Sequence, residues 1–213
     1  YTFNPNLLQD AASTGGGLTK TGAGQLTFGG TGSTYTGQLS VLDGTFSAST
    51  LNNNSANGVL GNSTLPVVLG SSGKQVTFQT GGASTNKNFT LVDGTSAVFD
   101  ITAATSTFSG NISGNATLLK FGAGSIIISG NNTYTGGTTL SGSGRTRIAS
   151  NTAFGTGPVN FNDTNAIYGT SIDSNTTAIT ISNPININSA TTTFWNGANE
   201  KTLTLTGPIL LTG

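Results

Sequence analysis

Short segments in which apolar and polar residues alternate run through most of the chain. Three of them, Gln25–Phe28, Leu39–Val41 and Thr45–Ala48, carry an apolar side chain at every second position. This period of two is the pattern of a β-strand with one buried face. The positions predicted to face inward in the first two segments are Leu26, Phe28, Leu39 and Val41.

Tight turns separate these segments. Gly22-Ala23-Gly24 and Asp43-Gly44 are turn sequences, and glycine permits the positive φ values that sharp corners need. Strands of three to five residues joined by such turns are too short for most sandwiches and are typical of the sides of a β-helix. We therefore predict an all-β fold, a parallel β-solenoid of about ten short rungs of ~20 residues each.

The same pattern continues beyond the first strands. Further strand segments are predicted at Val59–Gly61, Pro66–Leu69, Val76–Phe78, Phe89–Val92, Val98–Ile101, Thr107–Phe108, Ala153–Phe161, Ile167–Tyr168, Ile179–Ile181, Ile185–Ile187 and Thr202–Leu205. Asparagines at the corners between rungs are expected to form ladders.

One stretch occurs twice. Leu18, Lys20, Gly22 and Gly24 recur one hundred positions later, and Tyr35 and Gly37 recur after a single deletion. Their counterparts are Leu118, Lys120, Gly122, Gly124, Tyr134 and Gly136. The glycines are expected to turn corners, the apolar residues to fill the tube and the lysines to lie outside.

The repeat divides the chain into segments of one continuous solenoid. We predict an N-terminal cap or pairing segment at 1–15, a first repeat unit at 16–115 and a second at 116–213. A third copy is expected shortly after Gly213, so we expect either a longer array or an end completed by another molecule.

The motif resembles a known family. Leu-x-Lys-x-Gly-x-Gly-x-Leu-x-Phe/Ile, followed by Thr-Tyr-Thr-Gly, is similar to the autotransporter-associated β-strand repeat, at Leu18–Phe46 and Leu118–Ile148. Gly155–Phe161 resembles its usual continuation. The resemblance implies a right-handed parallel β-helix exported through the outer membrane of a Gram-negative-type bacterium, and therefore an extracellular location at the cell surface. Copy two departs from the pattern at Thr146, which stands where copy one has Phe46, at a position expected to face inward.

The composition argues against several classes of partner and site. Only 7% of the residues are charged, which would suit a disordered chain, but the alternating apolar groups favour a folded one. A net charge of zero argues against nucleic acid and acidic membranes as partners, and no apolar run is long enough for membrane insertion. Cys and His are absent, so we predict no disulfide, no metal site and no cofactor.

Candidate chemical groups are few. Asp43 and Asp93 each precede Gly in a turn, where Asp is favoured structurally, and Asn162–Asn165 lacks the spacing of a calcium loop. The alternating Arg145 and Arg147 are predicted to face outward, as a solvated surface or as a contact for acidic sugars. The carboxylates considered for paired acid–base chemistry are Asp10, Asp43, Asp93, Asp100, Asp163, Asp173 and Glu200.

No catalytic, cofactor-binding or metal-binding residue is predicted, and the binding residues stay unassigned. Tyr35 and Tyr134 are expected to pack within turns, and Phe194-Trp195 to lie in the core or at an interface.

The sequence leaves three hypotheses for the function. The leading hypothesis is a non-enzymatic structural or adhesive solenoid, part of a bacterial surface fibre or passenger. Its partners would be copies of itself, stacked head to tail, or surface polysaccharide. The alternative is a polysaccharide-binding or polysaccharide-cleaving β-helix protein. The third is an ice-binding solenoid, suggested by the threonines of 191–193 and by Thr202, Thr204 and Thr206.

Overall fold

The computed structural model describes residues 1–162, 170–174, 178–188, 192–195 and 202–212. The structure does not describe the side chains of residues 170–174, 193 and 195. The predicted strand at 167–168 and residues 163–165 of the Asn162–Asn165 sequence also lie outside the described residues. The described residues form 23 strands and no helix. Every strand pairing is parallel.

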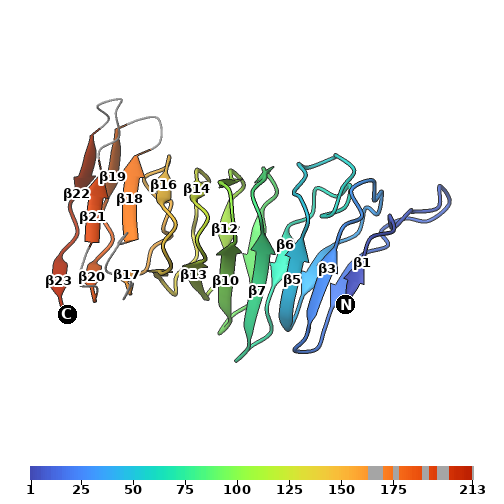
Figure 1. Cartoon of the computed structure of the whole chain (residues 1–213), viewed down its shortest axis with the longest axis horizontal. Helices are drawn as coiled ribbons and strands as arrows, with labels where there is room; N and C mark the ends of the chain where they lie inside the picture. The colour runs from blue at the N-terminus through green and yellow to red at the C-terminus, as the bar shows by residue number, and fades with distance from the viewer. Residues whose placement is uncertain (163–169, 175–177, 189–191, 196–201, 213) are drawn as a thin grey trace.

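The strands stack into a β-solenoid, an elongated rod with the first and last strands at opposite ends (Figure 1). The prediction of an all-β parallel β-solenoid is confirmed, with about nine turns. Its right-handed sense and the boundaries at 15 and 115 stay predictions.

One long sheet runs the whole length of the rod, and we call it sheet A. Its strands, in spatial order, are β1 (Thr2–Phe3), β3 (Gln25–Phe28), β5 (Gly44–Ala48), β7 (Gln75–Thr80), β10 (Ser96–Ile101), β13 (Thr117–Phe121), β15 (Thr138–Leu140), β17 (Val159–Phe161), β20 (Ile185–Ile187) and β23 (Ile209–Leu211).

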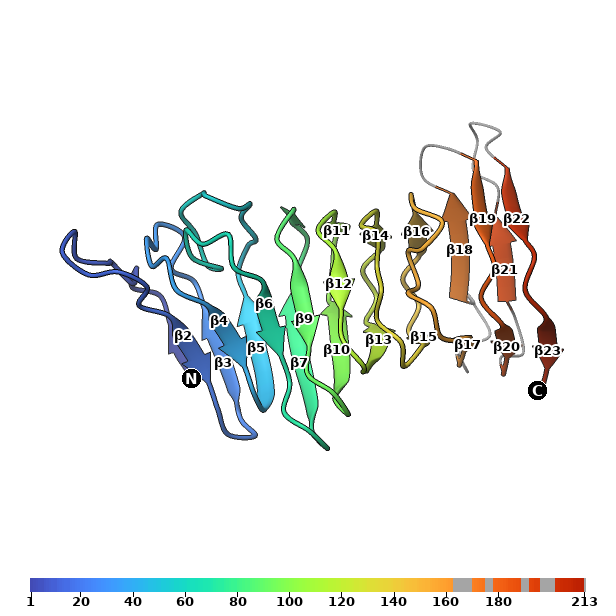
Figure 2. The ribbon, with the colours of Figure 1, turned by 180° about the vertical axis from the view of Figure 1, so that it is seen from behind.

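Shorter sheets form the other sides of the rod, as the view from behind shows (Figure 2). Sheet B contains β2 (Leu18–Lys20), β4 (Leu39–Val41), β6 (Val67–Leu69), β9 (Phe89–Leu91) and β12 (Ile112–Ser113). Sheet C contains β8 (Ser84–Thr85), β11 (Ser106–Phe108), β14 (Ile126–Ile128), β16 (Thr146–Ile148), β18 (Thr170–Ser174) and β21 (Thr192–Trp195). Sheet D contains β19 (Ile179–Ile181) and β22 (Leu203–Leu205).

Register partners in the middle of sheet A lie 20 or 21 residues apart, so one turn takes the predicted number of residues. Phe78, Phe99, Lys120, Leu140 and Phe161 follow one another in this way. The turn before Phe78 is longer, because Phe46 is its partner on the preceding strand. The extra residues form the polar loop around 52–58.

Most predicted strands are found where expected, but the one at Val59–Gly61 is wrong. Val59 and Leu60 are buried in a turn. The Asn52 side chain holds this turn by accepting from the Leu60 amide and donating to the Gly61 carbonyl, and Gly61 has a positive φ of 71°. The first part of the segment predicted at Ala153–Phe161 is likewise a turn, and only β17 is a strand there.

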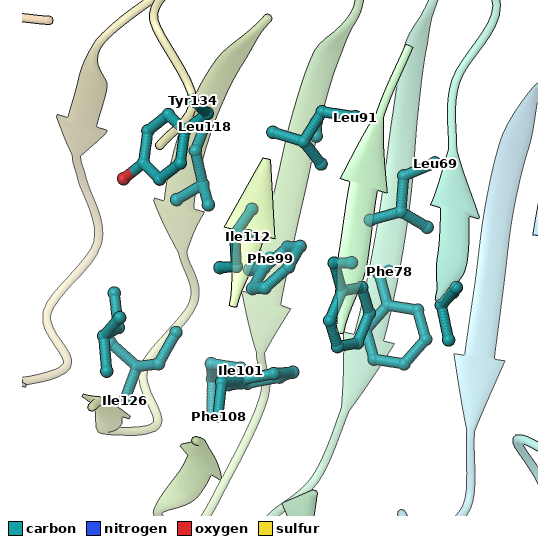
Figure 3. Close-up of a cluster of buried hydrophobic side chains, with 14 of the residues drawn as sticks. Leu69, Phe78, Leu91, Phe99, Ile101, Phe108, Ile112, Leu118, Ile126 and Tyr134 are labelled. Atoms are coloured by element: carbon teal, nitrogen blue, oxygen red, sulfur yellow. The ribbon is translucent and has the colours of Figure 1, made fainter. Parts of the chain in front are cut away.

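Aromatic side chains stack along the inside of the tube. The Phe99 ring centroid lies 4.8 Å from that of Phe108 and 5.4 Å from that of Phe89, and Phe78 packs beside them. Figure 3 shows this cluster continuing through Leu118 and Ile126 toward Tyr134. Leu39, Val41 and Phe28 are also buried and Leu26 is half-buried against the core, so the predicted inward face is confirmed.

The two repeats lie on different sides of the rod. In copy one the Leu-x-Lys strand, β2, belongs to sheet B, and the next strand, β3, belongs to sheet A. In copy two the corresponding strands, β13 and β14, belong to sheets A and C. The repeat therefore specifies a corner with its two flanking strands rather than a fixed face of the solenoid.

The prediction that the repeat lysines lie outside is wrong. Lys20 is 7% exposed and Lys120 is fully buried. The Lys20 ammonium donates to the carbonyls of Gly22, at 2.5 Å, and Asp43, at 2.9 Å, and that of Lys120 donates to Gly122 and Gly144, both at 3.0 Å. Because Gly22 and Gly122 turn the corner with φ of 75° and 86°, carbonyls of this corner are left for a cation to satisfy.

Asparagine ladders are present along one corner, as predicted. The Asn88 side chain accepts from the Asn111 amide at 2.9 Å, and the Asn111 side chain accepts from the Asn131 amide at 2.9 Å. A second ladder on sheet A joins Asn186 to Asn160 at 2.7 Å. In both ladders, an asparagine side chain of one rung accepts a hydrogen bond from a backbone or side-chain amide of the next rung.

Candidate interaction surface

The outer face of sheet A carries a shallow depression of about 360 Å³ over β3 to β13. It is lined by Gln25, Thr45, Gln75, Thr77, Gln79, Val98, Asp100, Leu119 and Phe121. The central strands β7, β10 and β13 lie side by side in mid-rod (Figure 1). Because side chains alternate along a strand, these residues project away from the core.

The apolar part of the depression is built by three residues on two strands. Val98 on β10 and Leu119 on β13 are register partners. Val98 is only 6% exposed although it stands outside the core cluster, so it forms the floor. Phe121 is 49% exposed and presents its ring at the side.

The polar part lies on the adjoining rungs. Gln79, Asp100 and Phe121 are successive partners across β7, β10 and β13. The Gln79 amide donates to the Asp100 carboxylate at 2.8 Å, and the Gln25 amide lies 3.5 Å from the Gln79 carbonyl oxygen. These bonds hold the side chains in place, and the lining contains one carboxylate and no cationic residue.

A comparison of the two repeats would have revealed this surface. Position by position, Leu119 and Phe121 of copy two correspond to Thr19 and Thr21 of copy one, and both of these threonines are exposed. The repeat therefore forms the same strand and lysine corner without an outward apolar pair. Nothing in the solenoid itself demands Leu119 and Phe121.

Of the carboxylates considered for paired acid–base chemistry, those that the structure describes make separate contacts. Asp43 accepts from the Gly44 amide at 2.8 Å and pairs with Lys74 at 3.5 Å, while Asp93 accepts from the Asn115 amide at 3.2 Å. Asp10 accepts from the Ala12 amide at 3.0 Å within its own turn. The structural interpretation of Asp43 and Asp93 thus agrees with their contacts. Asp163, Glu200 and the side chain of Asp173 lie outside the described residues.

Arg145 and Arg147 flank buried Thr146 on sheet C and are partly exposed, as the alternation predicts. Arg147 is the register partner of Ile127 on one side and of Asp173 on the other. Neither arginine belongs to the lining of the depression on sheet A.

Tyr35 and Tyr134 pack inside the solenoid, as predicted. The Tyr35 hydroxyl donates to the Val59 carbonyl at 2.9 Å, and the Tyr134 hydroxyl lies 2.5 Å from the Thr138 hydroxyl. Burial raises the pKa of both tyrosines. Phe194 packs on Phe161 with ring centroids 5.5 Å apart, whereas the Trp195 side chain lies outside the described part.

The threonines considered for ice binding are only partly described. Thr202, Thr204 and Thr206 are exposed, and Thr204 has Thr180 as its partner on the neighbouring rung. Residue 191 and the side chain of residue 193 fall outside the described ranges. Whether these threonines bind ice stays a prediction.

Among the residues that the structure describes, no group of three or more His, Cys, Asp or Glu side chains is arranged to hold a metal ion. Nor does this part of the chain include a helix with the length and apolar character needed to cross a membrane.

Comparison with known proteins identifies the repeat. The model of the passenger-associated-transport-repeat family matches residues 18–48 and 118–148, the two copies recognised in the sequence. The chain is 32% identical over 140 residues to the adhesin BmaC autotransporter of Brucella suis biovar 1 (strain 1330). The match covers 64% of this chain and 4% of that protein, so the chain spans a small part of its relative. No solved structure matches the chain.

Proposed function

We propose that this chain, with its two passenger-associated-transport-repeats, is a rod segment of the extracellular passenger of an autotransporter adhesin. Its role is non-enzymatic: it extends from the bacterial surface and contributes to adhesion. The observation that carries the proposal is the occurrence of both repeats as corners of one continuous parallel solenoid. The adhesin similarity over 140 residues supports it.

The solenoid suits this role physically. Each rung adds about 4.8 Å to the rod, and the rungs are joined by backbone hydrogen bonds and side-chain ladders such as Asn88–Asn111–Asn131. The interior is mainly apolar, and its two repeat lysines donate to the carbonyls of the corners. A rod of this kind extends in one direction and leaves its outer faces available for contacts.

Head-to-tail association is the finer part of the proposal. The outer edges of β1 and β23 end sheet A in this chain, and Ile209, Leu210 and Leu211 on β23 are exposed. A free strand edge accepts another parallel strand, either from a further rung of the same polypeptide or from a second molecule. Electron microscopy and light scattering distinguish these cases, because end-to-end stacking gives rods whose length grows with concentration.

Surface exposure is tested on intact cells of the source bacterium. Antibodies raised against the 213-residue chain are expected to label unpermeabilised cells, and external protease is expected to abolish the labelling. Labelling that needs cell lysis would contradict the assigned location.

Adhesion is tested separately with the purified chain coupled to fluorescent beads. The coated beads are expected to bind epithelial monolayers above the level of albumin-coated beads, and soluble chain is expected to compete. Equal binding by the two kinds of bead would overturn the adhesive role for this segment.

A further inference from the structure

We propose that the depression around Phe121 is a binding site for a neutral polysaccharide, laid along the rod across β7, β10 and β13. This inference deepens the proposed adhesive function by naming a ligand class and a site, and it rests on that function for its biological meaning. Its chemistry rests on the residues of the depression alone.

The depression combines an exposed aromatic ring with a fixed polar group. Phe121 is half exposed beside Leu119 and the Val98 floor, which provides an apolar surface for the C–H face of a pyranose ring. Asp100 stands one rung away. Its carboxylate has about four lone-pair sites, of which Gln79 uses one, so it can accept hydroxyl hydrogens from the sugar.

The charge of the lining favours a neutral ligand. Gln25, Gln75 and Gln79 supply amide donors and acceptors, and Asp100 supplies the only charge in the lining. An acidic polysaccharide would meet a carboxylate with no compensating cation. A ligand rich in hydroxyls and without negative charge fits this set of groups, because apolar contacts with a few fixed polar groups orient such molecules.

The spacing of the rungs along the rod matches the length of a sugar unit. Gln79, Asp100 and Phe121 present an amide, a carboxylate and a ring on successive rungs, which are about 4.8 Å apart. A sugar unit in an extended chain has a similar length, so a linear polysaccharide can place successive units on successive rungs.

The position in mid-sheet disfavours a peptide strand as occupant. β10 is paired on both sides, with β7 and β13, so it offers no free edge for strand addition. The surrounding outward positions are polar, including Thr45, Thr77 and Thr139. The apolar area is therefore small compared with the ~800 Å² per partner of a stable protein interface.

Copy one supplies the substitutions for a test. Phe121→Thr and Leu119→Thr introduce the residues that the repeat carries at 21 and 19, where β2 and its lysine corner form normally. These variants are expected to keep the wild-type melting temperature. Thr139→Ala, on the same face but outside the depression, is the matched control.

Binding is measured with the 213-residue chain by retardation in native gels containing dextran, mixed-linkage β-glucan or galactomannan, with heparin as the acidic probe. We expect retardation by at least one neutral polysaccharide. We also expect a loss of affinity of tenfold or more in folded Phe121→Thr and in Asp100→Asn, but not in Thr139→Ala. Retardation by heparin alone, or equal retardation of wild type and Phe121→Thr, would overturn the site.

The site and the proposed function fail separately. Bead adhesion that persists in Phe121→Thr, without retardation of the wild type by any neutral polysaccharide, overturns the site and leaves the adhesive role. Specific retardation without bead adhesion retains the site and contradicts the adhesive role.

Discussion

Lys120 on β13 occupies the inward position that Phe99 holds on the adjacent strand β10. The register partners of Lys120 on the following strands are Leu140 and then Phe161. The lysine is therefore a single cation within a row of inward apolar side chains. Its alkyl chain lies among them, and its ammonium reaches the carbonyls of Gly122 and Gly144 at the corner. The lysine thus links two neighbouring rungs of the solenoid at their turns.

Replacement of this lysine by an apolar residue of similar length should weaken the rod. Lys120→Met keeps much of the packing but leaves buried carbonyls without their donor, at about 1–3 kcal/mol. Lys20→Met should cost less, because Lys20 is slightly exposed and water can reach its carbonyls. Urea denaturation measures both changes. A Lys120→Met variant as stable as the wild type would show that the ammonium does not stabilise the corner.

The alternation of apolar residues was sufficient to predict most of the strands and their inward faces, but it also marked the buried turn at Val59–Gly61 as a strand. It also contained the position of the lysines, because Leu118 and Lys120 have the same parity in β13. The prediction that the lysines lie outside was wrong because it assumed that a charged side chain stays in water. The carbonyls that receive the ammonium are brought together only when the glycine corners of consecutive rungs stack, which is tertiary information.

The sequence also did not predict that the two copies of the repeat lie on different sides of the rod. This difference depends on how many sides the chain passes between Lys20 and Lys120, and this number follows from the register of every intervening rung. The depression at Phe121 depends on register as well, since it joins side chains from β3 to β13. The sequence did contain one indication of the depression, because copy two has Leu119 and Phe121 where copy one has Thr19 and Thr21.

The inward and outward faces of β3 differ sharply in their tolerance of charge. Phe28 is 1% exposed and packs between Phe3 and Phe46, whereas Thr27 is partly exposed. Phe28→Asp should cost several kcal/mol, roughly 4 or more, because it loses apolar burial and buries a carboxylate. Thr27→Asp should cost less than about 1 kcal/mol. Circular dichroism melts of the pair provide the comparison, and similar melting temperatures would contradict the assigned faces.

Stability should rise with pH in the mildly alkaline range because of Lys87. Burial lowers the pKa of this lysine from 10.5 to about 8, and its ammonium donates to the Ser63 carbonyl. Below pH 8 both states bind the proton, and folding bears the full cost of burying the charge. Between pH 8 and 10.5 the unfolded chain binds more protons than the folded one, so the free energy of unfolding increases.

The expected gain is about 2 kcal/mol from about pH 8 to about pH 10. Above pH 10 the raised pKa values of Tyr35 and Tyr134 act in the opposite direction, because the unfolded chain then loses tyrosine protons first. Urea titrations at a series of pH values test this profile. Lys87→Met should flatten the rise, and a rise that persists in this variant would assign it to another group.

Two buried threonines of copy two should respond in opposite ways to the same substitution. The Thr146 hydroxyl has no hydrogen-bond partner in its buried position on β16, which confirms that this departure from Phe46 faces inward. The Thr138 hydroxyl on β15 is equally buried, but it contacts the Tyr134 hydroxyl and donates to the Phe154 carbonyl at 3.1 Å. Valine has nearly the shape of threonine and lacks the hydroxyl.

Thr146→Val is therefore expected to stabilise the solenoid by about 1 kcal/mol, because it removes a polar group that is buried without a partner. Thr138→Val is expected to destabilise it by about 1–2 kcal/mol, because it leaves the Tyr134 hydroxyl and the Phe154 carbonyl without that contact. Urea denaturation of the two variants beside the wild type gives both signs in one experiment. Destabilisation by Thr146→Val would show that its hydroxyl is satisfied in solution, and stabilisation by both variants would show that the Thr138 contacts contribute nothing net.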